Sequence, residues 1–471
     1  MVDIAMTGRK VIYSDVDELT ASNVVEVLEK AMPVHIANSH DINFLYDEYR
    51  GKQNILNRTK NVRPEINNRV IENRANEIVS FKSGYLMGEP IQYVSHGNGE
   101  AVAEAITALN EYMFLEGKSC KDKELADWLH ICGTSYRIGL PRKQHDEDNA
   151  PFEIYTLDPR YTFIIYHSGL GNKPLAGVKY VIKDDGTTVY SVWTDNWYYE
   201  IAEGQIINSA VDDAEERVYE GEPTYYGQIP IIEYPANAAR LGAFEIVLPI
   251  LDAMNEVASN RIDGVEQFVQ ALMVFCNCDI DTETFAALKE LGALKYKSDS
   301  SNPADVKMLT QELNQMQTQT LVDYMYETVL TICGMPNRNG GNSTSDTGTA
   351  VIMRDGWSAA EARAKDTELM FRESEKRFLR LILRFLRDLK DIKLNLGNIE
   401  IRFTRRNYEN ITAKANVLTT MLNNPKIHPK LAFIHCGLFP DGELAYDMSR
   451  EYYENIIQGK GEGNQHGQVV T

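Results

Sequence analysis

Two long amphipathic helices on either side of a short insert restrict the fold more than any other feature of this sequence. In residues 244–272, apolar side chains recur at the i, i+3, i+4 and i+7 spacing of one helix face: Phe244, Val247, Leu248 and Leu251. A helix of roughly 24 residues is about 36 Å long, at about 1.5 Å per residue. Pro249 is compatible with such a helix only near its start or at a kink.

The second of these helices is predicted over 311–332, with one apolar face formed by Leu321, Met325, Val329 and Ile332. Its first half, TQELNQMQTQT, is polar nearly all round. A helix of this kind is expected to contact partner chains or to line a water-filled channel. The insert between the helices is predicted as a small α/β element. Its strands are expected at 273–279, 294–297 and 305–310, and its helix at 282–291.

Elsewhere the pattern changes between helical and strand periods. Helices are predicted at 21–31, 41–56, 67–85, 101–115 and 123–138. Segments rich in Tyr, Val, Ile, Thr and Trp then indicate strands at 153–157, 161–167, 177–183, 187–194 and 197–202. Asp185-Gly186 is a strong hairpin signal between two of them, so we expect an antiparallel meander. A Gly/Asn/Ser/Thr loop (334–348), a helix (349–389), a strand (399–403) and a helical segment (411–457) complete an α+β chain.

The net charge of the chain limits how it can bind nucleic acid. Its 471 residues carry a formal net charge of −20, and 43% are hydrophobic, enough for a sizeable core. Gripping DNA over most of a surface requires an excess of Lys and Arg, so that class of protein is disfavoured. A protein that lets a polyanion pass without sticking is not excluded. No secretory signal and no membrane-spanning run is expected, and the six cysteines are expected to be free thiols.

The motifs of catalysis and cofactor binding are incomplete. Gly117-Lys118-Ser119 ends like a phosphate-binding loop, but Tyr112 stands where the first glycine is required. Asp279, Asp281, Glu283 and Glu290 fit a calcium loop, but Thr284 replaces its turn glycine, and an Asp N-cap with an acidic helical turn explains them better. The nine histidines form no cluster in the sequence. We therefore expect no enzyme, no metal and no cofactor.

Two charge patterns remain. Residues 240–272 contain two bases and five acids, and residues 310–335 contain three acids and no base, so each segment has a net charge of −3. Residues 376–393 contain seven bases and two acids, with Arg380, Arg384 and Arg387 on one helix face. Both patterns can be ordinary solvated helix faces. The sharper interpretation of the basic helix is contact with phosphate or with an acidic partner.

The order of these elements resembles the portal proteins of tailed bacteriophages, in particular the long-tailed siphophage type of phages of Gram-positive bacteria. NRVIENRANEIVSFKSGYLMGEPIQY (68–93) is similar to that family's N-terminal helix and G-x-P turn, and QIPIIEYPAN (228–237) to its segment before the stem. Residues 244–275 resemble the first stem helix, and TGTAVIMRDG (347–356) the exit of the tunnel loop. Tyr234 replaces the family's usual Phe. The resemblance covers about residues 20–455.

The resemblance implies a phage portal fold that is mainly helical, with an antiparallel β wing, long stem helices and a small α/β clip. It implies these segments: an N-terminal helical arm (1–60), the wing (61–240), the first stem helix (241–272), the clip (273–309), the second stem helix (310–335), the tunnel loop (336–349), a long wing helix and strand (350–410), the crown (411–457) and a disordered tail (458–471).

It also implies functional sites. The loop facing DNA comprises Asn337, Arg338, Asn339, Gly340, Gly341, Asn342, Ser343, Thr344, Ser345, Asp346, Thr347 and Gly348. The acidic channel candidates are Glu245, Asp252, Glu256, Asp263, Glu266, Glu312, Asp323 and Glu327. The clip residues expected to dock partners are Asp279, Asp281, Glu283, Lys289 and Glu290. The basic wing helix carries Arg377, Arg380, Arg384 and Arg387.

The function implied is a ring, dodecameric in the family, at one capsid vertex of the virion, assembled in the host cytoplasm. It would pass double-stranded DNA without sequence specificity and dock the terminase large subunit, head-completion or connector proteins, and the major capsid and scaffolding proteins, with no membrane. A ring repeats every acid near its axis, and a negative lining repels phosphate. The alternatives are another head-tail connector or minor head protein, or a DNA-packaging enzyme, which would need a complete phosphate loop or a carboxylate metal site.

Overall fold

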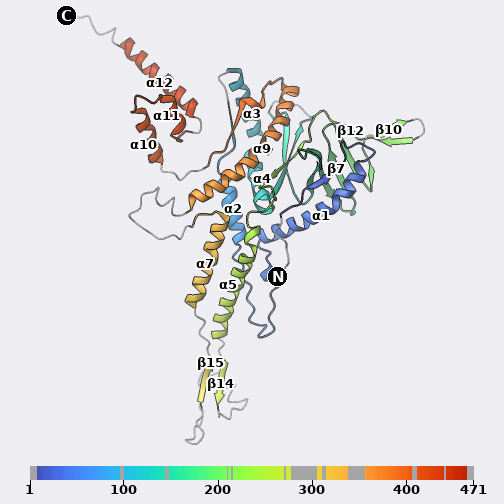
Figure 1. Cartoon of the computed structure of the whole chain (residues 1–471), viewed down its shortest axis with the longest axis vertical. Helices are drawn as coiled ribbons and strands as arrows, with labels where there is room; N and C mark the ends of the chain where they lie inside the picture. Colours follow the sequence, from blue (N-terminus) through green and yellow to red (C-terminus); the bar gives the residue numbers. More distant parts are fainter. Residues whose placement is uncertain are drawn as a thin grey trace, which may run out of the picture. The chain divides into compact units, whose positions relative to one another are not determined.

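The computed structural model describes residues 8–95, 100–143, 148–208, 210–213, 216–269, 272–276, 305–309, 315–337, 356–405, 411–439 and 442–463. The chain divides into two compact units (Figure 1). Unit 1 comprises Met1–Tyr46, Glu77–Ile246 and Gly334–Thr471, and unit 2 comprises Asp47–Asn76 and Val247–Cys333. The mixture of helices with mainly antiparallel sheets confirms the α+β class.

The largest sheet of unit 1 contains the predicted meander. Its strand order is β1-β5-β6-β7-β8-β12, and every pair is antiparallel except β1 with β5. The predicted hairpin lies between β6 and β7, where Gly186 has a φ of 85°. Helix α1 packs Val24, Val27 and Leu28 against this sheet (Figure 1). The bounds are β1 (Ile12–Ser14), β5 (Thr162–His167), β6 (Pro174–Ile182), β7 (Thr188–Trp193), β8 (Trp197–Ala202), β9 (Gln205–Ile206), β12 (Glu222–Pro223) and α1 (Val24–Tyr49).

A second core of unit 1 forms around helix α9 (Trp357–Lys390). α9 packs on the three-stranded sheet β13-β3-β4, and a two-stranded sheet pairs β16 with β2. Phe371, Phe378, Ile382 and Leu386 of α9 are all fully buried. The other elements around this core are β2 (Gln92–Ser95), β3 (Thr134–Pro141), β4 (Phe152–Leu157), β13 (Ile231–Pro235), β16 (Ile399–Arg402), α3 (Glu100–Leu115) and α4 (Lys118–Cys132).

Four charged side chains are buried together in this second core. Arg137 of β3 forms ion pairs with Asp122 of α4 and with Glu375 of α9, the latter at 3.2 Å. Lys118 of α4 lies 2.7 Å from Asp122 and 3.0 Å from Glu375. Burial alone raises the pKa of Glu375, but Lys118, Arg137 and the hydroxyls of Tyr93 and Tyr234 outweigh it and lower this pKa to about 2. We call Lys118, Asp122, Arg137 and Glu375 the buried charge cluster.

Three helices close the described chain. α11 (Pro429–His435) contacts both α10 (Ile411–Leu422) and α12 (Gly442–Gly463). α12 continues to Gly463, beyond residue 458, where order was expected to end. A two-stranded ribbon pairs β10 (Ala210–Asp213) with β11 (Glu216–Tyr219).

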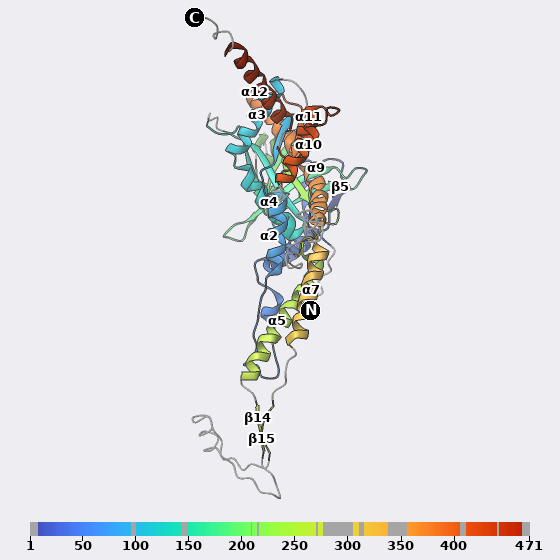
Figure 2. The ribbon, with the colours of Figure 1, turned by 90° about the vertical axis from the view of Figure 1, so that its left-hand side faces the viewer.

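Unit 2 consists of two long helices and a strand pair. α5 (Leu248–Val269) lies beside α7 (Gln315–Cys333), as Figures 1 and 2 both show, and β14 (Leu272–Cys276) pairs antiparallel with β15 (Asp305–Leu309). The predicted helix 282–291 and strand 294–297 lie outside the described residues. A 3-10 turn (Asn54–Asn57) and an extended segment up to residue 73 lie along α5.

Three helix predictions differ from the structure. α1 is one helix that includes Pro33, where two shorter helices were predicted. The helix predicted over 67–85 begins only at Arg74, as α2 (Arg74–Leu86), because the preceding backbone bonds to α5: Val70 N–H donates to Ser259 Oγ. The helix predicted over 123–138 ends at Cys132.

Gly133 explains that early end. Its φ is 78°, and its N–H donates to the Leu129 carbonyl, so it closes α4 in the left-handed conformation that favours glycine. A Cβ on Gly133 would lie 2.1 Å from the carbonyl oxygen of Arg240. The chain therefore turns here from helix into β3, a change that the hydrophobic pattern of 123–138 does not show.

Two buried histidines predict a loss of stability in mild acid. Burial lowers the pKa of His35 to about 4 and that of His130 to about 3, whereas an unfolded histidine titrates near 6.5. The unfolded chain therefore binds more protons below about pH 6.5. Each histidine should lower the free energy of unfolding by up to about 1.4 kcal/mol per pH unit as the pH drops from about 6.5 towards 4, and Glu48, whose pKa burial raises to about 7, opposes this fall between about pH 7 and 4.5.

Urea unfolding at pH 7.5, 6.5, 5.5 and 5.0 measures this slope. His130→Asn should reduce the slope by up to about 1.4 kcal/mol per pH unit, because an amide can keep the 3.1 Å hydrogen bond to Ser83 without taking up a proton. His35→Gln should act alike, because its amide can donate to the Arg160 carbonyl that His35 contacts at 3.2 Å. Variants with the same slope as the wild type between pH 6.5 and 5 would show that these rings do not control acid stability.

Candidate functional site

The helix pair α5–α7 of unit 2 carries most of the predicted channel acids, and the two helices expose them differently. Asp323 and Glu327 of α7 are exposed, and α7 contains no Lys or Arg. Gln319 donates to Asp323 at 2.7 Å and accepts from Arg261 of α5 at 2.8 Å. α7 therefore exposes acidic side chains and no base, beside exposed apolar side chains such as Leu321 and Tyr324. Glu312 lies outside the described residues.

Asp263 of α5 is not an exposed acid. Its side chain is 3% exposed, and it accepts from Arg58 at 2.8 Å, from Lys60, and from the backbone N–H of Asn68 at 2.8 Å. Burial alone raises its pKa, but these donors outweigh it and hold the pKa well below its usual range. The interpretation of Asp263 as a channel acid is therefore wrong: within the chain, its charge is already neutralised.

The prediction that Glu245 is a channel acid is also wrong. Its side chain is fully buried in unit 1, 2.7 Å from Arg9, and it accepts from the N–H of Gly242 at 2.9 Å. It therefore closes a turn and pairs a buried arginine, and it faces no solvent.

The other acids of α5 keep part of their surface. Glu256 is exposed, 3.7 Å from Arg58, and Glu266 is half-buried and accepts from Asn68 at 2.9 Å. Asp252 is half-buried, and burial raises its pKa. Residues 58–68 therefore supply the partners of α5, a role that the sequence did not reveal. The only signal for it was the presence of three bases, Arg58, Lys60 and Arg63, in a polar stretch without a helical period.

The ends of the predicted tunnel loop meet in unit 1. A Cβ on Gly356 would lie 3.6 Å from both the carbonyl oxygen of Met335 and Cα of Pro336. Gly334 and Gly356 have φ values of 64° and 81°, which favour glycine. The loop thus leaves and returns at one place. Asn337 is its last described residue before the gap, and the predicted residues 338–348 lie outside the described residues.

All five predicted clip residues lie outside the described residues: Asp279, Asp281, Glu283, Lys289 and Glu290. What is described is the base of that insert, where Leu272 pairs with Leu309 and Cys276 with Asp305. The insert is therefore entered and left through adjacent antiparallel strands.

The predicted basic residues lie on the described helix α9. Arg377, Arg380, Arg384 and Arg387 are exposed on α9, opposite its buried apolar face. We call these four residues the α9 basic row. The predicted single face is therefore present.

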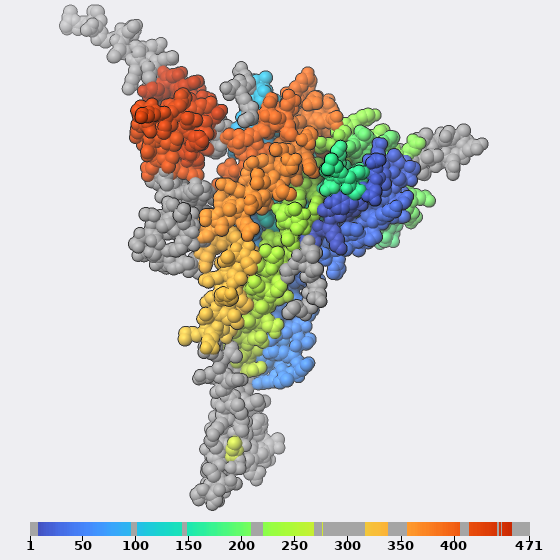
Figure 3. Space-filling view, in the orientation of Figure 1, coloured from blue at the N-terminus to red at the C-terminus, as the bar shows by residue number. Residues whose placement is uncertain are grey.

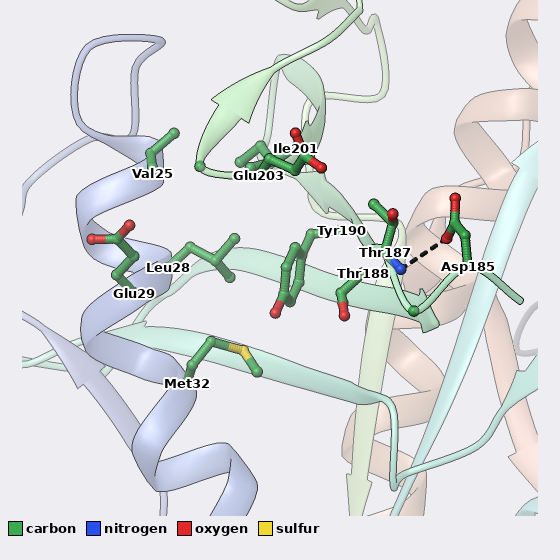
Figure 4. Close-up of a pocket in the computed structure, with 12 residues that line it drawn as sticks. Val25, Leu28, Glu29, Met32, Asp185, Thr187, Thr188, Tyr190, Ile201 and Glu203 are labelled. Atoms are coloured by element: carbon green, nitrogen blue, oxygen red, sulfur yellow. Dashed lines mark hydrogen bonds between the residues drawn. The ribbon is translucent and has the colours of Figure 1, made fainter. Parts of the chain in front are cut away.

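A hollow of about 570 Å³ lies between α1 and the β6–β7 turn (Figure 4). Val25, Leu28 and Met32 form its apolar side, and Glu29, Asp185 and Glu203 lie at its edge. Asp185 accepts from the N–H of Thr187 at 2.8 Å, and this bond lowers its pKa, so its carboxylate stabilises the hairpin turn. Across the described ranges, no group of three or more His, Cys, Asp or Glu could hold a metal ion. No described helix is long and apolar enough to cross a membrane.

Comparison with known proteins identifies the family. A family model described as phage portal protein, SPP1 Gp6-like, matches residues 30–443. A search of curated proteins found no match. Among solved structures, similar chains include one from the neck of an empty gene transfer agent particle computed with C6 symmetry. It is 11% identical, with a TM-score of 0.44, covering 78% of this chain and 90% of that one.

A second similar chain comes from the virion of a native gene transfer agent particle, at 11% identity and a TM-score of 0.47, covering 85% of this chain and 94% of that one. The family match spans most of the chain, including α5, α7 and α9. It confirms the resemblance found in the sequence: the chain belongs to the SPP1 Gp6-like family of phage portal proteins.

Proposed function

We propose that this portal protein forms a closed, dodecameric ring at one capsid vertex, through which double-stranded DNA enters and leaves. The observation that carries the proposal is the surface of α7. It is a 19-residue helix without Lys or Arg, and it exposes Asp323 and Glu327. Repeated around a ring, these acids would repel phosphate, and DNA could slide without the counterion release that holds it to a basic surface.

Apolar side chains exposed on the same helix pair support contact between copies. Ile262 and Val265 of α5 are 47% and 51% exposed, and Leu321 and Tyr324 of α7 are 48% and 67% exposed. Apolar groups of this size gain free energy when a neighbour covers them. A cyclic ring needs such heterologous contacts, in which one surface of each copy meets a different surface of the next.

The finer assignments extend the same proposal. The terminase large subunit and the head-completion or connector proteins would dock on the insert between β14 and β15. The major capsid and scaffolding proteins would contact unit 1, and assembly would take place in the host cytoplasm. The protein would act as a conduit and platform, with no reaction of its own; robust ATP turnover by the isolated chain would contradict this.

Negative-stain images of the purified chain test the ring, which should show a central hole. A monodisperse monomer under all assembly conditions would refute it. The double variant Ile262→Asp with Val265→Asp should shift the protein from rings to monomers. Covering one such side chain contributes up to about 1.5–3 kcal/mol, and a charge there opposes burial.

Light scattering coupled to size exclusion measures that shift. Gln267→Glu is the matched control, because it adds the same type of charge at an exposed polar site of α5 and should leave rings intact. Circular dichroism should show unchanged helix content in both variants. Rings of normal mass from the double variant would exclude this face of α5 from the subunit contact.

A further inference from the structure

The α9 basic row differs from three other bases of the same helix. Those three have acidic partners one turn away: Lys365 with Glu361, Arg372 with Glu368, and Lys376 with Glu373. Within the described residues, Arg377, Arg380 and Arg387 form no ion pair with a carboxylate. In a chain of net charge −20, three neighbouring arginines without an acid are available to an external anion.

The backbone that carries the α9 basic row is anchored by the hydrophobic core. The fully buried Phe378, Ile382 and Leu386 anchor the opposite face of α9, so the exposed side chains project from a rigid helix. From Arg377 to Arg387 the row spans about 15 Å, at about 1.5 Å per residue. α9 crosses the face of unit 1 drawn in Figure 3, where it is orange.

Arg384 is positioned by a neighbouring loop. Its guanidinium donates to the carbonyl of Tyr226, and the side chain of Gln228 donates to the carbonyl of Arg377 at 3.1 Å. Gly227 makes this possible, because a Cβ there would lie 1.7 Å from Nη1 of Arg384. A guanidinium has five N–H donors, so one bond to a carbonyl leaves others for an anion.

Tyr226 connects the row to a hollow of about 460 Å³. The hollow is lined by Tyr226, Arg142, Lys143, Asn149 and Glu153, among others. Arg142 is neutralised by Glu116 and Glu153. Lys143 is exposed and forms no ion pair with a described carboxylate, so it adds a base beside the row.

The composition of the face favours a polyanion over a folded protein. Between Phe371 and Phe403 no large hydrophobic side chain is exposed, and the loop beside Arg384 exposes Tyr225 alone. Protein interfaces bind mainly through buried aromatic and apolar anchors, whereas phosphate contacts need only positioned charge. Arginine is suited to phosphate because its planar fork can donate two parallel hydrogen bonds.

We propose that the α9 basic row binds the phosphate backbone of double-stranded DNA, without reading bases, at a site separate from the acidic α7 surface. The proposal rests on the function proposed above, which brings DNA to this protein. In that function, α7 lets the duplex slide, while the row on unit 1 holds a stretch of packaged DNA. One chain would thus have a surface on α7 that repels DNA and a surface on α9 that holds it.

The experiment measures the binding of a fluorescent duplex of about 20 base pairs to the full-length protein at rising salt. Arg380→Gln, Arg384→Gln and Arg387→Gln together should lower affinity about a hundredfold at about 50 mM salt. The slope of log affinity against log salt should fall by about 2–3, since each lost phosphate contact removes about 0.9. The matched control is Lys30→Gln, Lys52→Gln and Lys123→Gln, which removes the same charge at three exposed, acid-paired sites.

A second variant changes no charge. Replacing the same three arginines by lysine should keep the slope within about 0.9 of the wild-type slope, with unchanged circular dichroism, because each positive charge is retained. Equal losses in the arginine and lysine triples would show a general charge effect and overturn the proposal. So would wild-type DNA binding by the arginine triple together with loss of its binding to empty capsids, which would identify an acidic protein as the partner.

The two proposals can fail separately. Images without rings would refute the proposed conduit, while the duplex titration still reports on the row. Normal rings whose duplex binding is the same in wild type and arginine triple would refute the row alone.

Discussion

Replacing Glu375 by Gln should cost about 3–5 kcal/mol of unfolding free energy, because it leaves the buried charge cluster with an uncompensated positive charge. Glu375 and Arg137 are both fully buried, and Glu375 contacts Arg137, Lys118, Tyr93 and Tyr234. Urea unfolding followed by circular dichroism measures the loss. The control is Glu373→Gln on the same helix, whose side chain is 60% exposed and lies 3.8 Å from Lys376; it should change stability by under about 0.5 kcal/mol.

The cluster should behave as one unit. Arg137→Met alone should destabilise as strongly as Glu375→Gln, since either change leaves one sign of charge in excess. Combining Arg137→Met with Glu375→Leu leaves the neutral pair of Lys118 and Asp122, 2.7 Å apart. The combined loss should therefore be well below the sum of the single losses. Additive losses would show that the four charges do not compensate one another.

Acid should act on the same cluster. The pKa of Glu375 is about 2 in the folded chain and near its ordinary 4.5 when unfolded, so its contribution to stability is complete above about pH 5. That contribution is lost as the pH falls from about 5 towards 2, because the unfolded carboxylate binds the proton first. Glu375→Gln should lack this part of the acid transition.

The local elements of the fold were predictable because their signals are local. Asp185-Gly186 lies inside the β6–β7 turn, and the apolar spacing of 244–272 and 311–332 predicted α5 and α7. The helix end at Gly133 was missed because a single glycine that contacts the backbone near Arg240 has no periodic signature.

The charge partners could not be predicted for a related reason. Asp263 and Asp323 look alike in sequence, as acids on long helices, yet Asp263 is neutralised by Arg58 across 205 residues of chain. Glu375 meets Arg137 across 238 residues. Counting acids therefore predicts the charge of a segment, but it does not separate exposed acids from buried, paired ones. In contrast, the α9 basic row was predicted because all its members lie on one helix.

Shortening the tunnel loop should lower the amount of packaged DNA by about tenfold or more, while leaving rings intact. Deleting 341–348 keeps Met335, Pro336 and Gly356, which already lie within contact distance. The remaining segment therefore closes the same small gap, and a shorter loop costs no more closure entropy than the longer one. Subunit folding and ring formation should be unchanged, and only the proposed contact of the loop with DNA should be lost.

The physical reason for a packaging defect is that the proposed contact with DNA needs the length of the loop and no sequence-specific side-chain contact. This predicts that length matters and residue identity does not. A Gly-Ser segment of the same length in place of 341–348 should therefore package DNA at the wild-type level. Packaged DNA is measured by nuclease protection in capsids, and rings by negative stain. Normal packaging by the shortened variant would refute the role of the loop, and failure of the Gly-Ser variant would show that specific side chains contact the DNA.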